Sequence, residues 1–116
     1  MEKGLKTKYY LFDQNNSGGM LKVTKVLDEY VLIEALNAEH ANQLAETIGI
    51  YFGGVAKDID CPCCGDRWDA VKDHESYESL PDFFERRCIL FQKERYRSKL
   101  KIYNLSENGT IHLREK

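Results

Sequence analysis

The chain has 116 residues, of which 42% are hydrophobic and 31% charged, and its formal net charge at pH 7 is -2. This length suits one domain with a core of its own, so we expect a single domain over residues 1–116. The near-neutral total argues against a protein built to bind bulk polyanions. The charge is nevertheless divided along the chain. Nine acidic and two basic residues lie between Asp58 and Glu85, whereas seven basic residues and one acidic residue lie between Arg86 and Lys101.

The sequence predicts a cytoplasmic protein without membrane contact. The residues that follow Met1 include no apolar run typical of a signal peptide, and no stretch approaches the roughly 20 apolar residues of a membrane span. In a reducing compartment the four cysteines are expected as metal ligands or free thiols rather than disulfides. Adjacent Cys63 and Cys64 would form a disulfide with each other only under strain.

The first expected strand runs from Thr7 to Asp13, a short aromatic stretch that suits burial on at least one face. A polar run from Gln14 to Gly19 follows it and indicates either a hairpin loop or a recognition loop. In the second interpretation Gln14, Asn15 and Asn16 bind the base or sugar of a ligand, because side-chain amides both donate and accept hydrogen bonds.

Two further strands are predicted by the alternation of apolar and polar residues at Met20–Val26 and by the apolar run at Tyr30–Ala35, with a turn between them that favours a hairpin. A helix is predicted over residues 38–48, because apolar side chains recur there at helical spacing. Asn37 is its expected N-cap, and Gly49 is expected to end it in the left-handed conformation.

The segment from Asp60 to Trp68 contains three of the four cysteines and the only tryptophan. Within it, Cys61 and Cys64 have the spacing of half a zinc knuckle, in which a tight turn directs two thiolates at one cation. We therefore expect a structural Zn²⁺ site, to which donors from elsewhere in the chain contribute. The expected ligands are Cys61, Cys64, His74 and Cys88, with Cys63 or Asp66 as alternatives.

Two other interpretations of the cysteines remain open. The thiols could be reduced and pack in the turn beneath Trp68 without a metal. Alternatively, a cysteine and a nearby histidine could form the nucleophile of a small hydrolase.

The C-terminal third predicts a helix, a strand and a hairpin. The helix is expected from Pro81 to Arg87, since Ser79 is a suitable cap and proline is tolerated in a first turn. Basic residues occupy every second position from Lys93 to Lys101, and the apolar residues Tyr96, Leu100 and Ile102 lie at the other parity, which predicts a strand with one cationic face. The Asn108-Gly109 pair predicts the turn of a hairpin.

The cationic face favours a phosphate site, because alternate side chains of a strand lie roughly 6.5 to 7 Å apart, close to the spacing of successive phosphates in a nucleic acid. Arg95, Arg97 and Lys99 are the expected phosphate ligands, and the arginines can bind phosphate through paired hydrogen bonds. The alternative is a solvated edge strand whose lysines prevent aggregation.

These elements predict an α+β domain with a small antiparallel sheet, one main helix packed on a face of the sheet, and a cysteine knuckle loop. Consecutive hairpins favour antiparallel pairing of the N-terminal strands and the C-terminal hairpin. Because one small domain has little concavity, a homo-oligomer is expected to build any ligand pocket.

Three segments resemble a family of short uncharacterised proteins encoded by tailed bacteriophages. They are Phe12–Gly19, Gly49–Val55 and Asp60–Trp68. The resemblance implies a phage gene product that acts in the cytoplasm of a bacterial host, and it implies no established activity.

The expected function is non-enzymatic binding. Capture of a phosphate-bearing small ligand, such as a nucleotide signal of host defence, would counter host immunity. The alternative is a zinc-stabilised adapter that binds a host protein or nucleic acid. A small hydrolase is the third interpretation, although the chain is poor in convergent acid and base groups.

Overall fold

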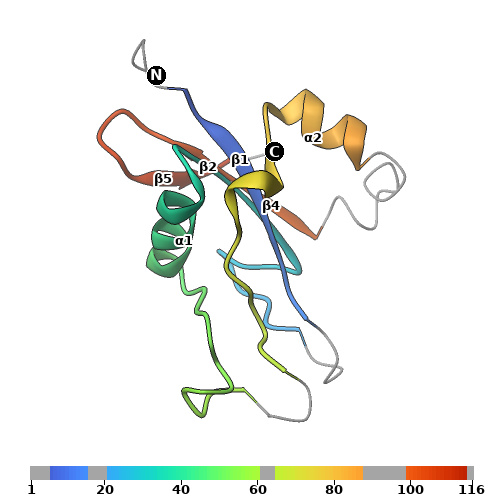
Figure 1. The fold of residues 1–116 in the computed structure, drawn as a ribbon, viewed down its shortest axis with the longest axis vertical. Coiled ribbons are helices and arrows are strands. Elements are labelled where there is room, and N and C mark those ends of the chain that lie inside the picture. The colour runs from blue at the N-terminus through green and yellow to red at the C-terminus, as the bar shows by residue number, and fades with distance from the viewer. Residues whose placement is uncertain (1–5, 16–20, 61–64, 88–98, 115–116) are drawn as a thin grey trace.

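A computed structural model describes residues 6–15, 21–60, 65–87 and 99–114. In these residues one mixed sheet of five strands has the order β3-β1-β2-β4-β5 (Figure 1). The strands are β1 (Lys8–Asp13), β2 (Tyr30–Ala35), β3 (Ser76–Tyr77), β4 (Leu100–Leu105) and β5 (Ile111–Leu113). The helices of the described residues are α1 (Ala38–Thr47), the 3₁₀ turn η1 (Asp73–Glu75) and α2 (Leu80–Arg86). The predicted α+β class is confirmed.

The prediction of a wholly antiparallel sheet is wrong at its centre, where β2 and β4 run parallel from the pair Tyr30 and Leu100 to the pair Ile33 and Tyr103. The pairings of β1 with β2, β1 with β3, and β4 with β5 are antiparallel. A parallel pair needs a long crossover connection, and the chain between β2 and β4 supplies one that includes both α-helices.

The predicted strand at Met20–Val26 is wrong over its described residues 21–26, and β2 pairs with β1 instead of forming the expected hairpin. The hydroxyl of Thr24 accepts a hydrogen bond from the backbone N–H of Leu27 at 3.0 Å, which stabilises a local turn. The alternation is also not matched by burial, since Val23 is 57% exposed.

Helix α1 confirms the prediction for residues 38–48 to within one residue. Asn37 caps it, because its Oδ1 accepts a hydrogen bond from the backbone N–H of His40 at 2.8 Å. A second acceptor comes from η1, where Asp73 Oδ1 accepts from the N–H of Ala38 at 2.9 Å. Gly49 adopts the expected positive φ of 105° beyond the helix end.

Apolar side chains cover both faces of the sheet. Alternate residues of a strand point to opposite faces, and the two faces belong to two core clusters. The α1 face includes Tyr10, Phe12, Val31, Ile33 and Tyr103. The α2 face includes Leu11, Leu32, Tyr77, Phe83 and Leu100. The expected packing of one helix on a face is therefore confirmed, and α2 adds a layer that the sequence analysis did not place.

The C-terminal elements agree with prediction where the structure describes them. Ser79 caps α2 by accepting a hydrogen bond from the N–H of Asp82 at 3.2 Å. The hairpin of β4 and β5 turns through Gly109 with a φ of 91°. Of the predicted cationic strand, the structure describes only Lys99 onward, and β4 begins at the next residue. No helix in the described ranges is long and apolar enough to cross a bilayer.

Candidate functional site

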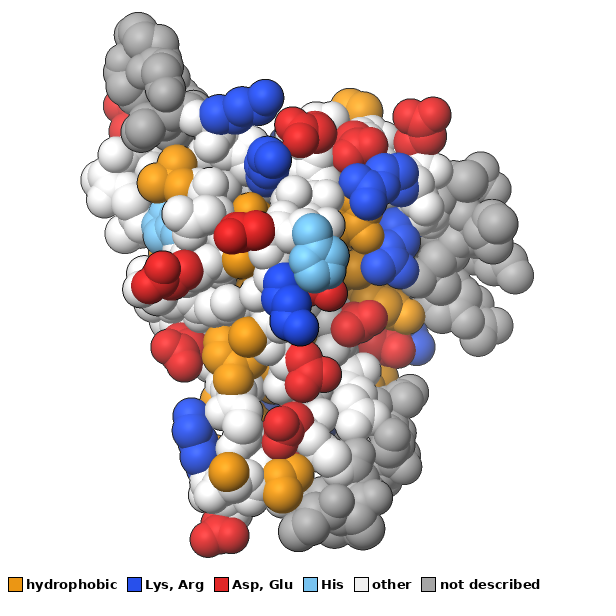
Figure 2. Space-filling view, in the orientation of Figure 1, with side chains coloured by type: hydrophobic (Ala, Val, Ile, Leu, Met, Phe, Trp, Pro, Cys, Tyr) orange, Lys and Arg blue, Asp and Glu red, His pale blue; other side chains and the backbone are white. Residues whose placement is uncertain are grey.

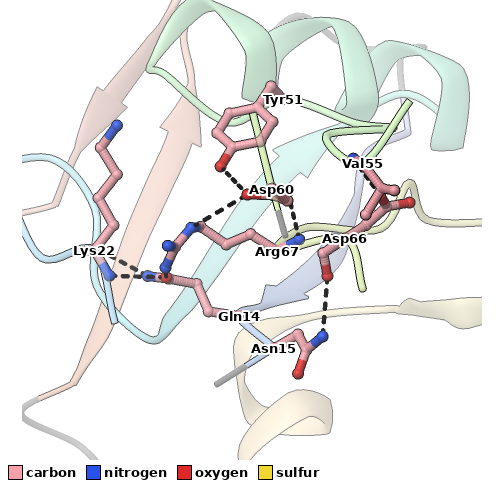
Figure 3. A network of polar contacts seen from close by, with 8 residues as sticks. All are labelled: Gln14, Asn15, Lys22, Tyr51, Val55, Asp60, Asp66 and Arg67. Atoms are coloured by element: carbon pink, nitrogen blue, oxygen red, sulfur yellow. Dashed lines mark hydrogen bonds and ion pairs between the residues drawn. The ribbon is translucent and has the colours of Figure 1, made fainter. Parts of the chain in front are cut away.

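A network of buried and half-buried polar groups holds the residues on both sides of the cysteine segment (Figure 3). Asp60, whose side chain is 7% exposed, lies on the N-terminal side. Its Oδ1 accepts a hydrogen bond from the Tyr51 hydroxyl and its Oδ2 accepts one from the backbone N–H of Arg67, both at 2.8 Å. The Arg67 Nε lies 3.9 Å from Asp60 Oδ1. These charge-assisted contacts fix the buried carboxylate in one position.

Asp66 anchors the C-terminal side of the same segment. Its Oδ1 accepts a hydrogen bond from the backbone N–H of Val55 at 2.9 Å, and its carbonyl accepts one from Asn15 Nδ2 at 3.2 Å. The backbone N–H of Asn15 also donates to the carbonyl of Arg67 at 2.9 Å. The C-terminal flank of the cysteines is therefore tied to Asn15, which is 51 residues from Asp66 along the chain.

The backbone at Gly54 passes so close to the network that no larger residue fits without movement. A Cβ atom placed there would lie 2.0 Å from Asp60 Oδ2 and 2.8 Å from a ring carbon of Tyr51. The carbonyl of Gly54 accepts hydrogen bonds from the N–H groups of Ile59 and Asp60 at 2.8 and 3.0 Å. Glycine permits this close approach because it has no side chain.

Gln14 is buried, and protein groups use its side-chain amide fully. The Nε2 donates to the carbonyls of Lys22 and Asp28 at 2.8 and 3.0 Å. The Oε1 accepts from the backbone N–H of Lys22 at 2.9 Å and from Arg67 Nη1 at 3.0 Å. Since an amide has two donors and one acceptor oxygen with two lone pairs, we assign this side chain a structural role rather than the ligand contact expected from sequence.

The network joins the three segments that carry the sequence resemblance. The segment Phe12–Gly19 contributes Gln14 and Asn15, the segment Gly49–Val55 contributes Tyr51 and Val55, and the segment Asp60–Trp68 contributes Asp60, Asp66 and Arg67. Trp68 follows directly and is 1% exposed in the α1-side core. Residues that flank the cysteines are thus fixed both by polar contacts and by core packing.

A cavity of about 400 Å³ lies on the α2 side of the sheet. Strand β3 pairs with β1 only at Tyr9 and Tyr10, so the later part of β1 borders the cavity beside the segment Asp69–Val71. Its apolar lining includes Leu11, Ala70 and Val71. Its charged lining includes the acidic residues Asp13, Asp69 and Glu75 and the basic residues Arg86 and Arg87.

Tyr77 orients both arginines of the cavity. The guanidinium of Arg86 lies over the Tyr77 ring, 4.4 Å from its centroid, and Arg87 Nε donates to the Tyr77 hydroxyl at 2.8 Å. The ring is itself fixed by an edge contact with Phe83, at a centroid distance of 4.9 Å. Arg86 also donates from Nη1 to the carbonyl of Ser76 at 3.2 Å. The two cations are thus positioned before any ligand arrives.

Asp13 lies in an unfavourable position for a negative charge. Asp13 is an exposed residue at the end of β1, but the surrounding chain still partly desolvates its carboxyl, and this raises the pKa of Asp13 above its usual value. Arg87 lowers this pKa, and nearby Asp69 and Glu29 raise it. The acidic and basic groups of the cavity are therefore close enough to affect one another.

Residues 7–113 match the family described as Domain of unknown function (DUF7296). The chain belongs to this family. No curated protein and no solved structure matches the chain. The DUF7296 match spans both the polar network and the cavity, so both belong to the family domain of this chain, and the family description assigns no activity to either.

The structure describes one of the four expected zinc ligands of this DUF7296 protein. Cys61, Cys64 and Cys88 lie outside the described residues, and His74 is exposed on η1. Figure 1 shows η1 beside the middle of the sheet, whereas the segments that flank the cysteines reach the lower end of the view. The structure does not bring His74 to these segments. Within the described ranges, no group of three His, Cys, Asp or Glu residues is arranged to hold a metal.

Of the expected ligand-binding residues, some likewise lie outside the described residues and others lie within them. Asn16, Arg95 and Arg97 lie outside the described residues, and Gln14 and Asn15 belong to the network. Lys99 is described, and its Nζ lies 3.6 Å from Glu29 Oε1.

Sequence reasoning missed the cavity residues Asp13, Asp69, Arg86 and Arg87. The adjacent arginines at the end of a predicted helix were a usable signal, because they begin the basic stretch that follows the acidic one. The carboxylates gave no such signal, since they come together only because β1 and the segment Asp69–Val71 line the same cavity.

Proposed function

We propose that this protein is a non-enzymatic binding protein that captures a small phosphate-bearing ligand in the α2-side cavity. The observation that carries the proposal is the pair of arginines, Arg86 and Arg87, oriented by Tyr77 on the wall of a cavity of about 400 Å³. Small-molecule sites commonly have volumes of roughly 300 to 1,000 Å³. The cavity is formed within one chain, so the proposal does not need the homo-oligomer expected from sequence.

Guanidinium groups suit a phosphate because they offer several N–H donors in a fixed plane. Tyr77 engages Nε of Arg87, which leaves its terminal nitrogens without a partner among the residues that the structure describes. Arginines already held in place lose less conformational entropy when a ligand binds. Arg95, Arg97 and Lys99 stay predicted as further phosphate contacts.

A small ligand suits the described surface better than a polyanion. Figure 2 shows acidic and basic side chains interspersed over the coloured part of this face, without a continuous basic area there. Backbone contacts to a nucleic acid need a basic surface, whereas one phosphate needs only a local pair of cations.

The resemblance to tailed-bacteriophage proteins gives the proposal a biological setting. A phage protein that captures a nucleotide in the bacterial cytoplasm would remove a signal on which host defence depends. Binding alone is sufficient for this role, so no catalytic group is required.

Calorimetric titration with AMP, GMP, CMP and UMP tests the proposal. We expect at least one of them to bind, and Arg87→Gln to weaken that binding by about 10- to 100-fold, because each lost charge-assisted hydrogen bond is worth roughly 1.5 to 3 kcal/mol. Arg114→Gln is the matched control, since Arg114 is exposed and does not line the cavity.

Absence of binding for all four nucleotides at millimolar concentrations would overturn the proposal. Equal affinity of the wild type and Arg87→Gln would remove the cavity as its site. Thermal unfolding of each variant separates loss of binding from loss of fold, because Arg87 also contacts Tyr77.

The second candidate function is a zinc-stabilised adapter for a host protein or nucleic acid. The observation that favours it is the network around Asp60 and Asp66, which fixes both flanks of the cysteine segment. A cysteine pair with fixed flanks loses less entropy on binding a metal, and structural zinc contributes directly to folding.

Elemental analysis of protein purified without chelator tests this candidate. We expect about one zinc per chain, and a lower content in Cys61→Ser and Cys64→Ser, since a structural site uses thiolate ligands. Cys88→Ser tests the more distant expected ligand. A zinc content far below one per chain, with normal thermal unfolding, would exclude the structural metal.

A further inference from the structure

We propose that the cavity selects a guanine nucleotide, with the carboxylates of Asp13 and Asp69 accepting hydrogen bonds from the N1–H and the 2-amino group of the base. This inference rests on the proposed function, because Arg86 and Arg87 hold the phosphate in both. It adds the identity of the base, which the arginines cannot determine.

The carboxylates of the cavity have the chemistry of base recognition. An ionised carboxylate only accepts hydrogen bonds, so it favours ligand groups that donate. Among the described residues, neither Asp13 nor Asp69 forms an ion pair. Glu75 is less available, because its Oε1 already accepts from the backbone N–H of Lys72 at 2.9 Å. Asp13 and Asp69 are therefore the acceptors that we assign to the ligand.

Asp13 gains most from a hydrogen-bond donor. Its carboxyl is partly removed from water, which disfavours the ionised form and raises its pKa; Arg87 and its own backbone N–H lower this pKa, and nearby Asp69 raises it. A ligand with two N–H groups would supply the hydrogen bonds that water supplies to an exposed carboxylate. It would also place donors between two acidic groups that otherwise repel each other.

Guanine is the base that meets these requirements. Its Watson–Crick edge carries two adjacent donors, the N1–H and the 2-amino group, beside the O6 acceptor. Uracil presents carbonyl oxygens on both sides of one N–H, and these oxygens would face the carboxylates unfavourably. Adenine and cytosine each place one amino group beside a ring nitrogen that accepts. A two-carboxylate wall therefore disfavours uracil most.

The remaining lining of the cavity is partly apolar. Leu11, Ala70 and Val71 provide apolar lining, and burial of an aromatic ring against such side chains is favourable. The carboxylates come from β1 and the segment Asp69–Val71, while the arginines come from the C-terminal end of α2. We assign the acidic groups to the base and the basic groups to the phosphate of one nucleotide.

Calorimetric titration of the full chain with GMP, IMP and UMP tests the inference. IMP is the sharpest comparison, because it retains the N1–H of guanine and lacks only the 2-amino group. We expect GMP to bind roughly tenfold more tightly than IMP, and IMP more tightly than UMP, since one lost charge-assisted hydrogen bond changes affinity by about this factor.

Variants then assign the selectivity to particular side chains. Asp13→Asn and Asp69→Asn should reduce the ratio of GMP to UMP affinity by about tenfold each, while Arg87→Gln should weaken GMP and UMP by the same factor. Glu85→Gln is the matched control, because Glu85 is an exposed carboxylate on α2 that does not line the cavity. It should change neither affinity.

The outcomes separate the two proposals. Equal affinities for GMP and UMP, both weakened by Arg87→Gln, would overturn the guanine inference and leave the phosphate-binding function in place. A selectivity for GMP that survives both Asp13→Asn and Asp69→Asn would also overturn it. Absence of nucleotide binding in the wild type would overturn both.

Discussion

Close packing against neighbouring atoms limits which residue can occupy certain positions of this protein, and Gly54 is the clearest case. We expect Gly54→Ala to lower the free energy of unfolding by about 1 to 3 kcal/mol, because the added methyl group would overlap the Asp60 carboxylate. That carboxylate cannot move without breaking its hydrogen bonds to Tyr51 and Arg67. Urea-induced unfolding measures the change.

A double-mutant cycle with Asp60→Ala identifies the cause of this destabilisation. Asp60→Ala should itself destabilise the protein, because it leaves buried partners without an acceptor. If the carboxylate is the obstacle, Gly54→Ala should cost much less in the Asp60→Ala background. Strictly additive effects would show that the strain at Gly54 has another source.

Asp13 leads to the opposite expectation, because Asp13→Asn should stabilise the protein at neutral pH. Burial raises the pKa of Asp13, and Asp69 and Glu29 raise it further against the lowering effect of Arg87. The folded state then binds more protons than the unfolded state, so this group makes stability fall as pH rises from the unfolded pKa of 3.8 through the folded value. Asparagine resembles the protonated carboxyl and avoids that loss.

Urea unfolding at about pH 7 and about pH 4 checks this expectation. The advantage of Asp13→Asn should be present near pH 7 and should shrink as the pH falls, because the wild-type carboxyl becomes neutral. A variant less stable than the wild type near pH 7 would show that attraction to Arg87 outweighs burial. Greater stability combined with weaker GMP binding would indicate a residue retained for a ligand.

At the scale of elements, α1 is held by two side-chain acceptors at its N-terminus. We expect Asn37→Ala to lower the free energy of unfolding by about 1 kcal/mol, because it removes the acceptor for the N–H of His40. Asn37→Ser is the matched control and should retain most of the stability, since serine is also a good cap. Thermal or urea unfolding measures both variants. Equal stabilities of the two variants would mean that Asp73 alone is a sufficient cap.

Elements with local signals could be predicted from the sequence. Asn37 and Gly49 marked the ends of α1, Ser79 marked the start of α2, and Gly109 marked the turn of the C-terminal hairpin. In each case the signal and the structure lie within a few residues. The failure at residues 21–26 has the complementary cause, because alternation predicts a strand only when a neighbouring strand is available. Residues 21–26 have no such neighbour among the described strands, because β1 pairs with β2 instead.

At the scale of the whole molecule, the centre of the sheet and the candidate sites could not be predicted. The parallel pairing of β2 with β4 depends on a crossover that no short motif encodes. The role of Gln14 depends on partners 8, 14 and 53 residues away along the chain. The sequence also did not show that the three resemblance segments meet in one network. These features depend on contacts between residues far apart in the sequence, which local patterns do not encode.

Asp13, the last residue of β1, directly precedes Gln14, and Arg67 lies two residues before Asp69. Asp13 and Asp69 line the cavity, whereas Gln14 and Arg67 belong to the network. Two short stretches of chain therefore contribute to both the cavity and the network. We predict that a metal on the cysteines and a nucleotide in the cavity are linked ligands. If one changes the affinity for the other by some factor, the second changes the affinity for the first by the same factor. Titrating nucleotide with and without bound zinc, and zinc with and without nucleotide, measures one coupling free energy from two directions.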